Sequence, residues 1–443
     1  MGALFGTDGV RGVAGEFLSA DLALALGRAA AGIAGESAGA PPQVLIVRDT
    51  RESGEMLEAS LAAGVAAGGG HALLGGVLPT PGAALLVRRY GFDMAAVVSA
   101  SHNPYRDNGI KFFGPEGTKI SDAQEERIEA MVAGDETLPA TRIGRVRELH
   151  GAPGDYLREL EVRFEGLDLA DRKVLLDCAH GATYRVAPEI FRRLGAQVET
   201  VAAAPDGRNI NHGCGSTHVD GLAAQVAEGG HDLGFAFDGD GDRVLAVDRA
   251  GTVVDGDELL ALAALHLRRE DRLPGHGVAV TVMTNYGFHT AMREAAIEVA
   301  VTPVGDRHVL SELLRRGWSL GGEQSGHIID TGFVPSGDGV ASALLTLEAL
   351  GEGDLAERQA MRKLPQRLVN VTVSDRGALE ASQAVWGAVE AESEALEGRG
   401  RVLIRPSGTE PLVRVMVEAP AEDECEAVTA RLVSVVESEL GIA

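Results

Sequence analysis

Short apolar runs alternate with amphipathic stretches along most of the chain. "QVLIVRD" at residues 43–49 precedes the helical pattern "EMLEASLAAGVAAG", and "KVLLDCA" at residues 173–179 precedes "RVAPEIFRRLG". A third pair, "GVAVTVMT" and "GFHTAMREAA", begins at residue 277. Such alternation is typical of βαβ units, so the sequence predicts mixed or largely parallel sheets covered by helices. Ser121 with Gln124 three residues later has the capping-box pattern and predicts a helix start.

The last part of the chain has a different pattern. From about residue 366, "RLVNVTVS", a helix through Trp386, "RVLIRPSGTEPLVRVMVEA" and a final helix indicate a smaller α+β domain. We therefore expect an α/β protein with three similar mixed-sheet domains and a smaller α+β C-terminal domain around a central cleft. The predicted domains are 1–155, 156–253, 254–365 and 366–443.

Three strand-like runs end in polar, glycine-bearing loops: "MAAVVSASHNP", "LGFAFDGDGDR" and "WSLGGEQSGH". A fourth such loop, "RPSGTEPLVR", follows a strand in the last domain. Ligands of open α/β sheets bind beyond the carboxyl ends of the strands. We therefore expect the first three loops to face one shared cleft.

Composition narrows the classes of partner. The chain has 443 residues, of which 45% are hydrophobic, and its 65 acidic and 40 basic residues give a formal charge of -25. This charge repels nucleic acid and anionic membranes, so neither is an expected partner. A few arginines inside a cleft can still attract a small anion.

The cysteines and the lack of a long apolar segment indicate the cellular compartment of the protein. The three cysteines, Cys178, Cys214 and Cys425, are odd in number and far apart, so they predict neither a disulfide framework nor a CxxC metal site. No apolar run reaches the ~18 residues of a membrane span, and no secretory signal pattern opens the chain. We expect a cytoplasmic protein.

The "DGDGDR" stretch carries the most specific chemistry. Carboxylates at the alternate positions Asp238, Asp240 and Asp242 can converge on a hard cation, and the glycines between them permit tight turns. The other interpretation is a solvated acidic turn between two strands. Mg²⁺ generally takes few carboxylates, so three side-chain oxygens leave room for a further ligand.

Ser101 can provide that ligand. Its surroundings contain neither a GxSxG elbow nor an SxxK pattern, so triad chemistry is not expected. By itself, "SHNP" after a strand is typical of an ordinary turn. If the serine carries a phosphoryl group, the phosphoryl oxygens complete the metal site and the cation neutralises the charge of the group being transferred.

Seven motifs together resemble one known family. They are "FGTDGVRG", "SASHNPYRDNGIKFF", "DGRNINHGCGSTH", "DGDGDR", "TPVGDRHV", "GGEQSGH" and "RPSGTEPLVRV", and they span nearly the whole chain. In order and spacing they resemble the α-D-phosphohexomutases, most closely the bacterial phosphoglucosamine mutase branch. The resemblance implies a reversible shift of phosphate between the C6 and C1 oxygens of a hexose, through a sugar bisphosphate.

The resemblance also implies roles for individual residues. Ser101 matches the serine that carries the phosphoryl group, and the metal ligands are Ser101 with the three aspartates of "DGDGDR". Lys111 is the first candidate for proton transfer and His327 the second, whereas Arg11 matches a residue that approaches the phosphoserine. The predicted substrate-binding residues are Arg243, Asp306, Arg307, Glu323, Ser325, Arg405, Ser407, Gly408, Thr409 and Arg414.

The implied substrates are hexosamine phosphates: glucosamine 6-phosphate and glucosamine 1-phosphate, with Mg²⁺ as cofactor and glucosamine 1,6-bisphosphate as activator and intermediate. Gln324 in "GGEQSGH" resembles the phosphoglucosamine mutase version of this loop. Three alternatives remain: a mutase of the same fold acting on glucose or mannose phosphates, a phosphatase with an aspartyl nucleophile, and a non-catalytic sugar-phosphate sensor. The oligomeric state is left open, with a homodimer among the options.

Overall fold

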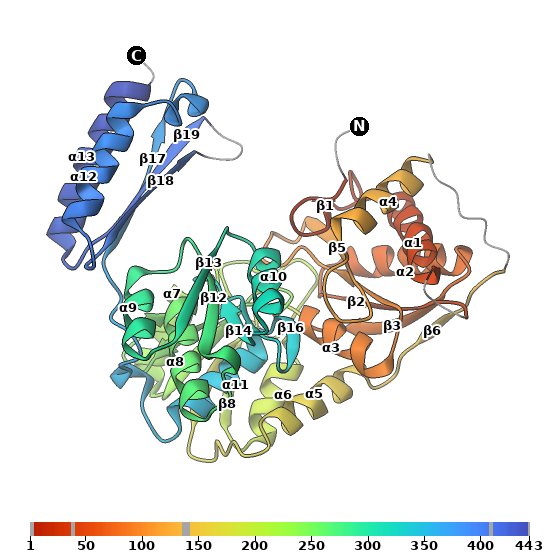
Figure 1. Cartoon of the computed structure of the whole chain (residues 1–443). Coiled ribbons are helices and arrows are strands. Elements are labelled where there is room, and N and C mark those ends of the chain that lie inside the picture. The colour runs from red at the N-terminus through yellow and green to blue at the C-terminus, as the bar shows by residue number, and fades with distance from the viewer. Residues whose placement is uncertain (1–3, 37–39, 135–141, 407–410, 442–443) are drawn as a thin grey trace. The chain divides into compact units, whose positions relative to one another are not determined.

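The chain folds into two compact units. The computed structural model describes residues 4–36, 40–134, 142–406 and 411–441 (Figure 1). The first unit contains Met1–Val282 and Val299–Arg358, and the second contains Met283–Glu298 and Gln359–Ala443. Three of the sheets belong to the first unit, and a small fourth sheet belongs to the second.

The first sheet has six strands in the order β1-β5-β4-β2-β3-β6. The pairs that β2 forms with β3 and β4 are parallel, whereas β5 is antiparallel to both β1 and β4, so the sheet is mixed. Its strands are β1 (Val10–Val13), β2 (Gln43–Arg48), β3 (His71–Val77), β4 (Met94–Val98), β5 (Asp107–Phe113) and β6 (Val146–Glu148). The accompanying helices are α1 (Ala20–Gly35), α2 (Gly54–Ala67), α3 (Thr80–Tyr90) and α4 (Asp122–Ala133).

The predicted start of α4 is confirmed. The Ser121 side chain accepts from the backbone N–H of Gln124, and the Gln124 side chain accepts from the backbone N–H of Ser121. This reciprocal capping box satisfies two of the donors that a helix start leaves unpaired.

The second sheet has five strands in the order β11-β10-β9-β7-β8. Its strands are β7 (Lys173–Asp177), β8 (Gln197–Val201), β9 (Leu233–Phe237), β10 (Val244–Asp248) and β11 (Val253–Val254), with helices α5 (Ala152–Arg163), α6 (Val186–Arg193) and α7 (Asp220–Gly229). The parallel core β8-β7-β9 continues into an antiparallel β9-β10 pair. The "DGDGDR" stretch connects that pair.

The third sheet has the order β13-β12-β14-β15-β16. Its strands are β12 (Gly277–Thr281), β13 (Glu298–Thr302), β14 (Leu320–Gly322), β15 (Ile328–Asp330) and β16 (Val334–Gly337). The helices of this segment are α8 (Gly256–Arg269), α9 (Tyr286–Glu294), α10 (Asp306–Arg316) and α11 (Gly339–Leu350), with short 3₁₀ turns η1 (Pro274–His276) and η2 (Leu355–Glu357). Of these helices, α9 belongs to the second unit.

The second unit is built on a three-stranded antiparallel sheet with the order β17-β19-β18. Its elements are β17 (Gln366–Thr372), η3 (Arg376–Leu379), α12 (Gln383–Ala395), β18 (Arg401–Pro406), β19 (Leu412–Glu418) and α13 (Glu422–Leu440). Glu418 is fully buried and accepts from Tyr286 N, which joins α9 to this sheet. Three mixed sheets and a smaller C-terminal sheet agree with the predicted fold class.

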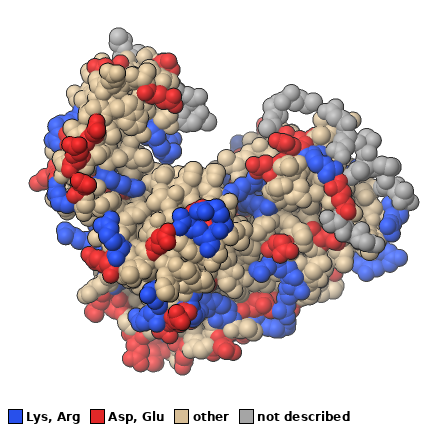
Figure 2. Space-filling view, viewed as in Figure 1, with Lys and Arg blue, Asp and Glu red and all other residues tan. Residues whose placement is uncertain are grey.

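Two properties of the surface bear on function. No helix in the described part of the chain combines the length and apolarity that a membrane span requires. On the face drawn in Figure 2, acidic and basic side chains are interspersed. That face therefore offers no extended basic surface for a nucleic acid backbone.

Candidate active site

Ser101 lies in the loop that leaves the buried strand β4. All five residues of β4 are buried, and Ser101 has a φ of 50°, in the left-handed region. Its Oγ donates a 2.6 Å hydrogen bond to Asp238 Oδ2 and lies 3.3 Å from His102 Nδ1. The predicted phosphoryl carrier therefore faces the first of the predicted metal ligands.

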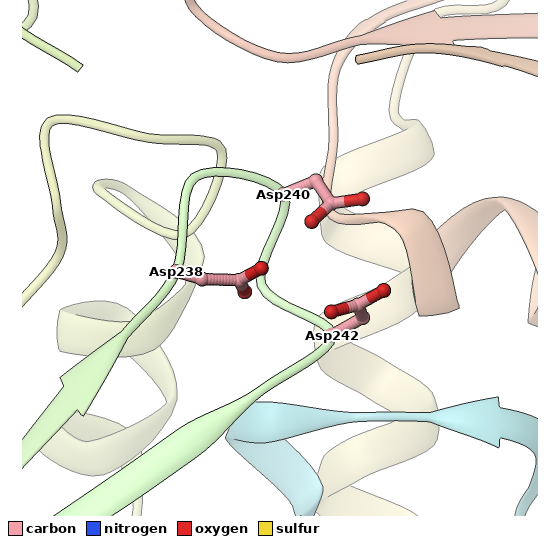
Figure 3. A group of neighbouring side chains, drawn as sticks. All are labelled: Asp238, Asp240 and Asp242. Atoms are coloured by element: carbon pink, nitrogen blue, oxygen red, sulfur yellow. The ribbon is translucent and has the colours of Figure 1, made fainter. Parts of the chain in front are cut away.

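The three predicted metal ligands lie on one loop, which connects β9 and β10 (Figure 3). One carboxylate oxygen from each of Asp238, Asp240 and Asp242 lies within 4.8 Å of the others, and all three residues are buried. Gly241 has a φ of 72°, which lets the chain turn between the last two aspartates. A Cβ at Gly239 would lie 2.5 Å from Ser101 O, so glycine allows the two loops to approach.

The charges of this loop fit a bound cation. Burial raises the pKa of Asp238 well above its ordinary value, and Asp242 and Asp240 raise it further. Asp240 Oδ1 and Asp242 Oδ1 are buried and have no hydrogen-bond partner among the described residues. A hard cation with oxygen ligands relieves both the repulsion and the unpaired oxygens. The residues present therefore fit Mg²⁺, with Ser101 Oγ beside them.

Lys111 lies next to the metal loop because β5 pairs with β4, in the register Val97↔Lys111. Its buried Nζ is 2.8 Å from Asp240 Oδ2 and 3.4 Å from Asp8 Oδ2. Burial alone would lower the pKa of Lys111, but the carboxylates of Asp240, Asp8 and Asp242 outweigh burial and raise it. In turn, burial would raise the pKa of Asp240, and Lys111 holds it below its ordinary value. Lys111 is thus held as a cation beside the aspartate loop.

Sequence reasoning missed three contributors to this cluster: Thr80, Asp8 and Lys119. Thr80, at the start of α3, donates from Oγ1 to Asp240 Oδ2 at 2.6 Å, and Thr80 N donates to Asp240 O at 2.9 Å. Asp8 pairs with both Lys111 and Lys119, and it also pairs with Arg11. The sequence offers two signals, neither of which specifies a contact: Asp8 lies inside "FGTDGVRG", and Lys119 is one of only four lysines in the sequence.

A cavity of about 760 Å³ in the first unit is lined by residues of the serine loop, the aspartate loop and the "GGEQSGH" loop. Its lining includes Arg11, Ser101, Asp242, Arg243, Asp306, Arg307, Glu323 and His327. The expectation that the loops of the first three domains face one cleft is therefore met. His102 also lines the cavity, and burial, then Arg243 and Arg11, lower its pKa, which favours the neutral ring.

The "GGEQSGH" loop connects β14 and β15. Glu323 accepts from Gly305 N at 3.0 Å and lines the cavity, whereas Ser325 is exposed. Gln324 does not line the cavity; its Nε2 donates to Asp255 Oδ2 at 3.2 Å. His327 is buried, and its Nε2 accepts from Gly337 N at 3.1 Å, which leaves its Nδ1 3.6 Å from Asp242 Oδ1. The hydrogen bond requires an unprotonated Nε2, so the proton of a neutral His327 lies on Nδ1.

Asp306 and Arg307, both predicted to bind sugar, are engaged in ion pairs. Asp306 Oδ2 lies 2.6 Å from Lys119 Nζ. Arg307 pairs with Asp122 and Glu125 at the start of α4. These contacts connect the domain of the first sheet to the domain of the third sheet along the wall of the cavity.

The predicted phosphate loop of the second unit is described only at its edges. Arg405 and Arg414 are cross-strand partners on β18 and β19. Burial, then the neighbouring Arg414, lowers the pKa of Arg405. Two adjacent like charges favour a bound anion. Ser407, Gly408 and Thr409 lie outside the described residues.

Comparison with protein families gives four consecutive matches that together cover most of the chain. Phosphoglucomutase/phosphomannomutase alpha/beta/alpha domain I matches residues 2–138, domain II matches 154–251 and domain III matches 255–368. The C-terminal domain of the same family matches residues 368–435.

Individual proteins agree with this family assignment. The chain is 52% identical to a phosphoglucosamine mutase of Desulforudis audaxviator, over 98% of both chains, and 45% identical to one of Geobacillus kaustophilus, over 100% of both. Its fold is similar to a phosphoglucomutase/phosphomannomutase family protein of Burkholderia thailandensis, with a TM-score of 0.83 at 23% identity over 99% of both chains. An Aspergillus fumigatus N-acetylphosphoglucosamine mutase, solved with GlcNAc-6P and magnesium, gives a TM-score of 0.69 at 17% identity over 98% of this chain and 96% of that one.

Proposed function

The chain belongs to the phosphoglucomutase/phosphomannomutase family, and we propose that it is an isomerase that interconverts glucosamine 6-phosphate and glucosamine 1-phosphate through a phosphoserine at Ser101. One observation carries the mechanism: the Ser101 hydroxyl lies 2.6 Å from a carboxylate of the aspartate loop, inside a cavity of sugar-phosphate size. The sugar assignment is supported by well-covered relatives, 45–52% identical, that are named phosphoglucosamine mutase.

The proposed reaction has two matching halves. In the first, the P–Oγ bond of phospho-Ser101 breaks, a P–O1 bond forms on glucosamine 6-phosphate, and the proton of O1 is passed to Ser101 Oγ. The resulting 1,6-bisphosphate turns over in the cleft. In the second half, the P–O6 bond breaks, the phosphoryl group returns to Ser101 Oγ, and the proton of Oγ is passed to O6. The product is glucosamine 1-phosphate and the phosphoserine is restored.

We assign Lys111 to stabilising the transferred charge and to protonating the sugar oxygen when the phosphoryl group leaves it. The buried, protonated state of its Nζ supports this role, because a preorganised cation in a dry site interacts strongly with developing negative charge. His327 is the second candidate, and its Nε2 must first give up the hydrogen bond from Gly337 N. Arg11 also lines the cavity, and we assign it to contact with the phosphoryl group at Ser101.

Mg²⁺ is the proposed cofactor, held by Asp238, Asp240, Asp242 and the oxygen at Ser101. When bound, it neutralises charge on the phosphoryl group being transferred. The aspartates themselves fix the loop: Asp238 Oδ1 accepts from Arg243 N at 3.1 Å, and Asp240 accepts from both Thr80 and Lys111.

The remaining predicted residues are assigned to binding. Arg243, Glu323, Asp306 and Arg307 line the cavity, where hydroxyl, ammonium and phosphate groups of a sugar would lie. Ser325 is exposed on the "GGEQSGH" loop, which also carries Glu323. We assign Arg405, Ser407, Gly408, Thr409 and Arg414 to the phosphate that is not reacting, because paired arginines with hydroxyl and backbone donors suit such an anion.

Several wider assignments belong to the same proposal. Domain limits near residues 155, 253 and 365 and a cytoplasmic location follow from the sequence patterns and the widely spaced cysteines. A homodimer stays a prediction. Phosphoglucomutase or phosphomannomutase activity is the second candidate function, since the family's own name includes both.

Phosphorus NMR tests the proposal. The protein is given glucosamine 6-phosphate, Mg²⁺ and a trace of the 1,6-bisphosphate, beside glucose and mannose 6-phosphates and a Ser101→Ala control. Fastest formation of glucosamine 1-phosphate, dependent on Ser101, is expected. Faster conversion of another sugar would reassign the substrate, whereas release of free phosphate by the alanine variant would contradict the mutase mechanism.

A further inference from the structure

Arg51 is a fully buried arginine three residues after the end of β2, and it lies against the serine loop. Its Nε pairs with Asp49 Oδ2 at 2.8 Å. The rest of its guanidinium donates to backbone carbonyls of the serine loop: Ser101 O (2.9 Å), Asn103 O (2.8 Å), Asp107 O (2.9 Å) and Pro104 O. An arginine buried to this degree is costly unless its donors are satisfied, and here Asp49 and the serine loop together supply the acceptors.

Asn211 holds the same loop from the domain of the second sheet. Its Nδ2 donates to Ser101 O at 2.8 Å and to Asn103 O at 3.1 Å. Asn211 belongs to "NINHGCGSTH", a motif with no catalytic role so far. Its φ of 58° is left-handed, a conformation that asparagine adopts more readily than most residues. The carbonyl of Ser101 thus has two donors, one from each of two domains.

The amide side of Ser101 is held by the same network. Ser101 N donates to Ser99 Oγ at 3.0 Å, and Ser99 Oγ donates to Asp49 Oδ2 at 2.5 Å. Asp49 therefore connects the amide of Ser101 to the arginine that holds its carbonyl. Both peptide groups that flank the serine are fixed by buried partners.

The loops that carry Arg51 and Asn211 are also joined to each other. Glu52 N donates to Gly207 O at 2.9 Å, and Thr50 Oγ1 donates to His180 O at 2.5 Å. These bonds connect the segment after β2 to the domain that carries Asn211. The two donors are consequently held in one frame.

We propose that Arg51 and Asn211 are positioning residues that hold Ser101 in its left-handed conformation and so direct Oγ toward Asp238 throughout the reaction cycle. The proposal rests on the proposed function. A φ of 50° is unfavourable for a residue with a Cβ and persists where surrounding contacts hold it. Every one of these contacts goes to backbone atoms, whereas the Oγ hydrogen bond to Asp238 must break whenever a phosphoryl group occupies Oγ. The backbone contacts can remain intact while the side chain gains and loses its phosphoryl group.

Asn211→Gly is the main test, because glycine tolerates the positive φ and only the side-chain donor is lost. Misplacing Oγ by about an ångström lowers the rate of phosphoryl transfer, so we expect kcat to fall about 10- to 100-fold with the KM for glucosamine 6-phosphate unchanged within about twofold. Arg51→Lys, which keeps the charge but loses the planar fork, should act in the same direction. If it does not fold, Asn211→Gly decides the test.

Asn209→Gly is the matched control. It removes an asparagine from the same loop whose side chain binds only within that loop, at Ala204 O and Asp206 N. A kcat loss equal to that of Asn211→Gly would overturn the proposal, because loosening the loop would then explain the effect. A raised KM with unchanged kcat in Asn211→Gly would also overturn it.

Hydrogen exchange without substrate separates this proposal from the proposed function. Peptides covering residues 99–107 should exchange faster in Asn211→Gly than in Asn209→Gly or the unmodified protein. Equal exchange in all three, with mutase activity present in the unmodified protein, would overturn the positioning role alone. Absence of mutase activity in the unmodified protein would overturn the proposed function, and the positioning role with it.

Discussion

Two groups of proposed site residues differ in how their polar groups are held. The proposed reacting cluster, Ser101, Lys111, Asp238, Asp240 and Asp242, is buried, and each of its members has partners from distant segments. The proposed sugar-facing cluster, Asp306, Arg307, Glu323 and Ser325, is partly exposed, with 29% of the Arg307 side chain accessible to solvent. The described ion pairs of this second cluster are partly accessible to solvent.

The difference fits the roles proposed for the two clusters, which are phosphoryl transfer and sugar binding. Buried charges interact strongly but are costly unless paired, so the reacting cluster is fixed before the substrate arrives. Partly exposed ion pairs contribute little to stability and can rearrange at small cost. Arg307 can therefore exchange Asp122 and Glu125 for a ligand, whereas Lys111 cannot leave Asp240 as cheaply. Substitutions in the reacting cluster should lower kcat, and those in the sugar-facing cluster should raise KM.

The largest effect is expected from Ser101→Ala. Removing the atom that accepts and donates the phosphoryl group should lower mutase activity by about 10⁴-fold or more. Measurement of glucosamine 1-phosphate formation checks this. Ser99→Ala is a useful comparison, because it removes a nearby buried hydroxyl that does not face Asp238. Activity of Ser101→Ala above that of Ser99→Ala would contradict the assignment.

Asp240→Asn should have the next largest effect. The change removes one charge that both Lys111 and a bound Mg²⁺ require, so kcat should fall about 10²- to 10³-fold at fixed Mg²⁺. The Mg²⁺ concentration for half-maximal activity should rise, and chelation by EDTA should abolish activity of the unmodified protein. Asp248→Asn removes a similarly buried carboxylate at the far end of β10. An identical Mg²⁺ dependence in Asp240→Asn and the unmodified protein would rule out Asp240 as a ligand.

Arg307→Ala should have a moderate effect that falls on binding. Loss of a cation from the cavity wall should raise the KM about tenfold, with kcat reduced less than about threefold. Arg315→Ala on the same helix is the control, because Arg315 is exposed and pairs with Glu312. Steady-state kinetics would place Arg307 in the reacting cluster instead if kcat fell and KM did not change.

The last expected effect concerns stability rather than rate. Asp338 is buried, accepts from Tyr156 Oη at 2.9 Å, and lies near Asp242; burial raises its pKa to about 6. Because the folded protein binds this proton more tightly than the unfolded chain, the free energy of unfolding falls as pH rises from about 4 to 6, by about 3 kcal/mol at most. Asp338→Asn should flatten that slope.

Urea unfolding between pH 4.5 and pH 8 in EDTA measures the slope of both proteins. Asparagine keeps the shape of the side chain and an acceptor for Tyr156, so a difference reports the charge. Equal slopes would show that the carboxyl of Asp338 does not titrate in this range.

Local sequence was sufficient for some of these features. Asp238, Asp240 and Asp242 are close in the chain, so their alternation with glycine predicts convergence without knowledge of the fold. The strands β2, β7 and β12 lie within the apolar runs that predicted them, and α4 begins at its capping box. Ser101 was proposed as a metal ligand from the residues themselves, whereas the role of Lys111 came from the resemblance. The structure adds the reason for their proximity: the antiparallel register of β4 and β5.

Contacts between distant segments were not predictable. Thr80 reaches Asp240 across 160 positions, and Asn211 reaches Ser101 across 110. Arg51 has no distinguishing neighbours in the sequence, and its burial depends on carbonyls presented by another loop. Arg307 was expected to face the sugar, and only the structure shows that Asp122 and Glu125 already pair with it. The inclusion of α9 in the second unit likewise depends on the buried Glu418.

The central claim, that Ser101 carries the phosphoryl group between the two sugar oxygens, is tested most directly by intact protein mass. The protein is treated with the sugar 1,6-bisphosphate, freed of it, and then given glucosamine 6-phosphate. We predict a gain of one phosphoryl group, located at Ser101 by fragmentation, and its loss with stoichiometric formation of the 1,6-bisphosphate. A phosphoryl group found on Asp238, or mutase turnover with Ser101 never modified, would contradict the account.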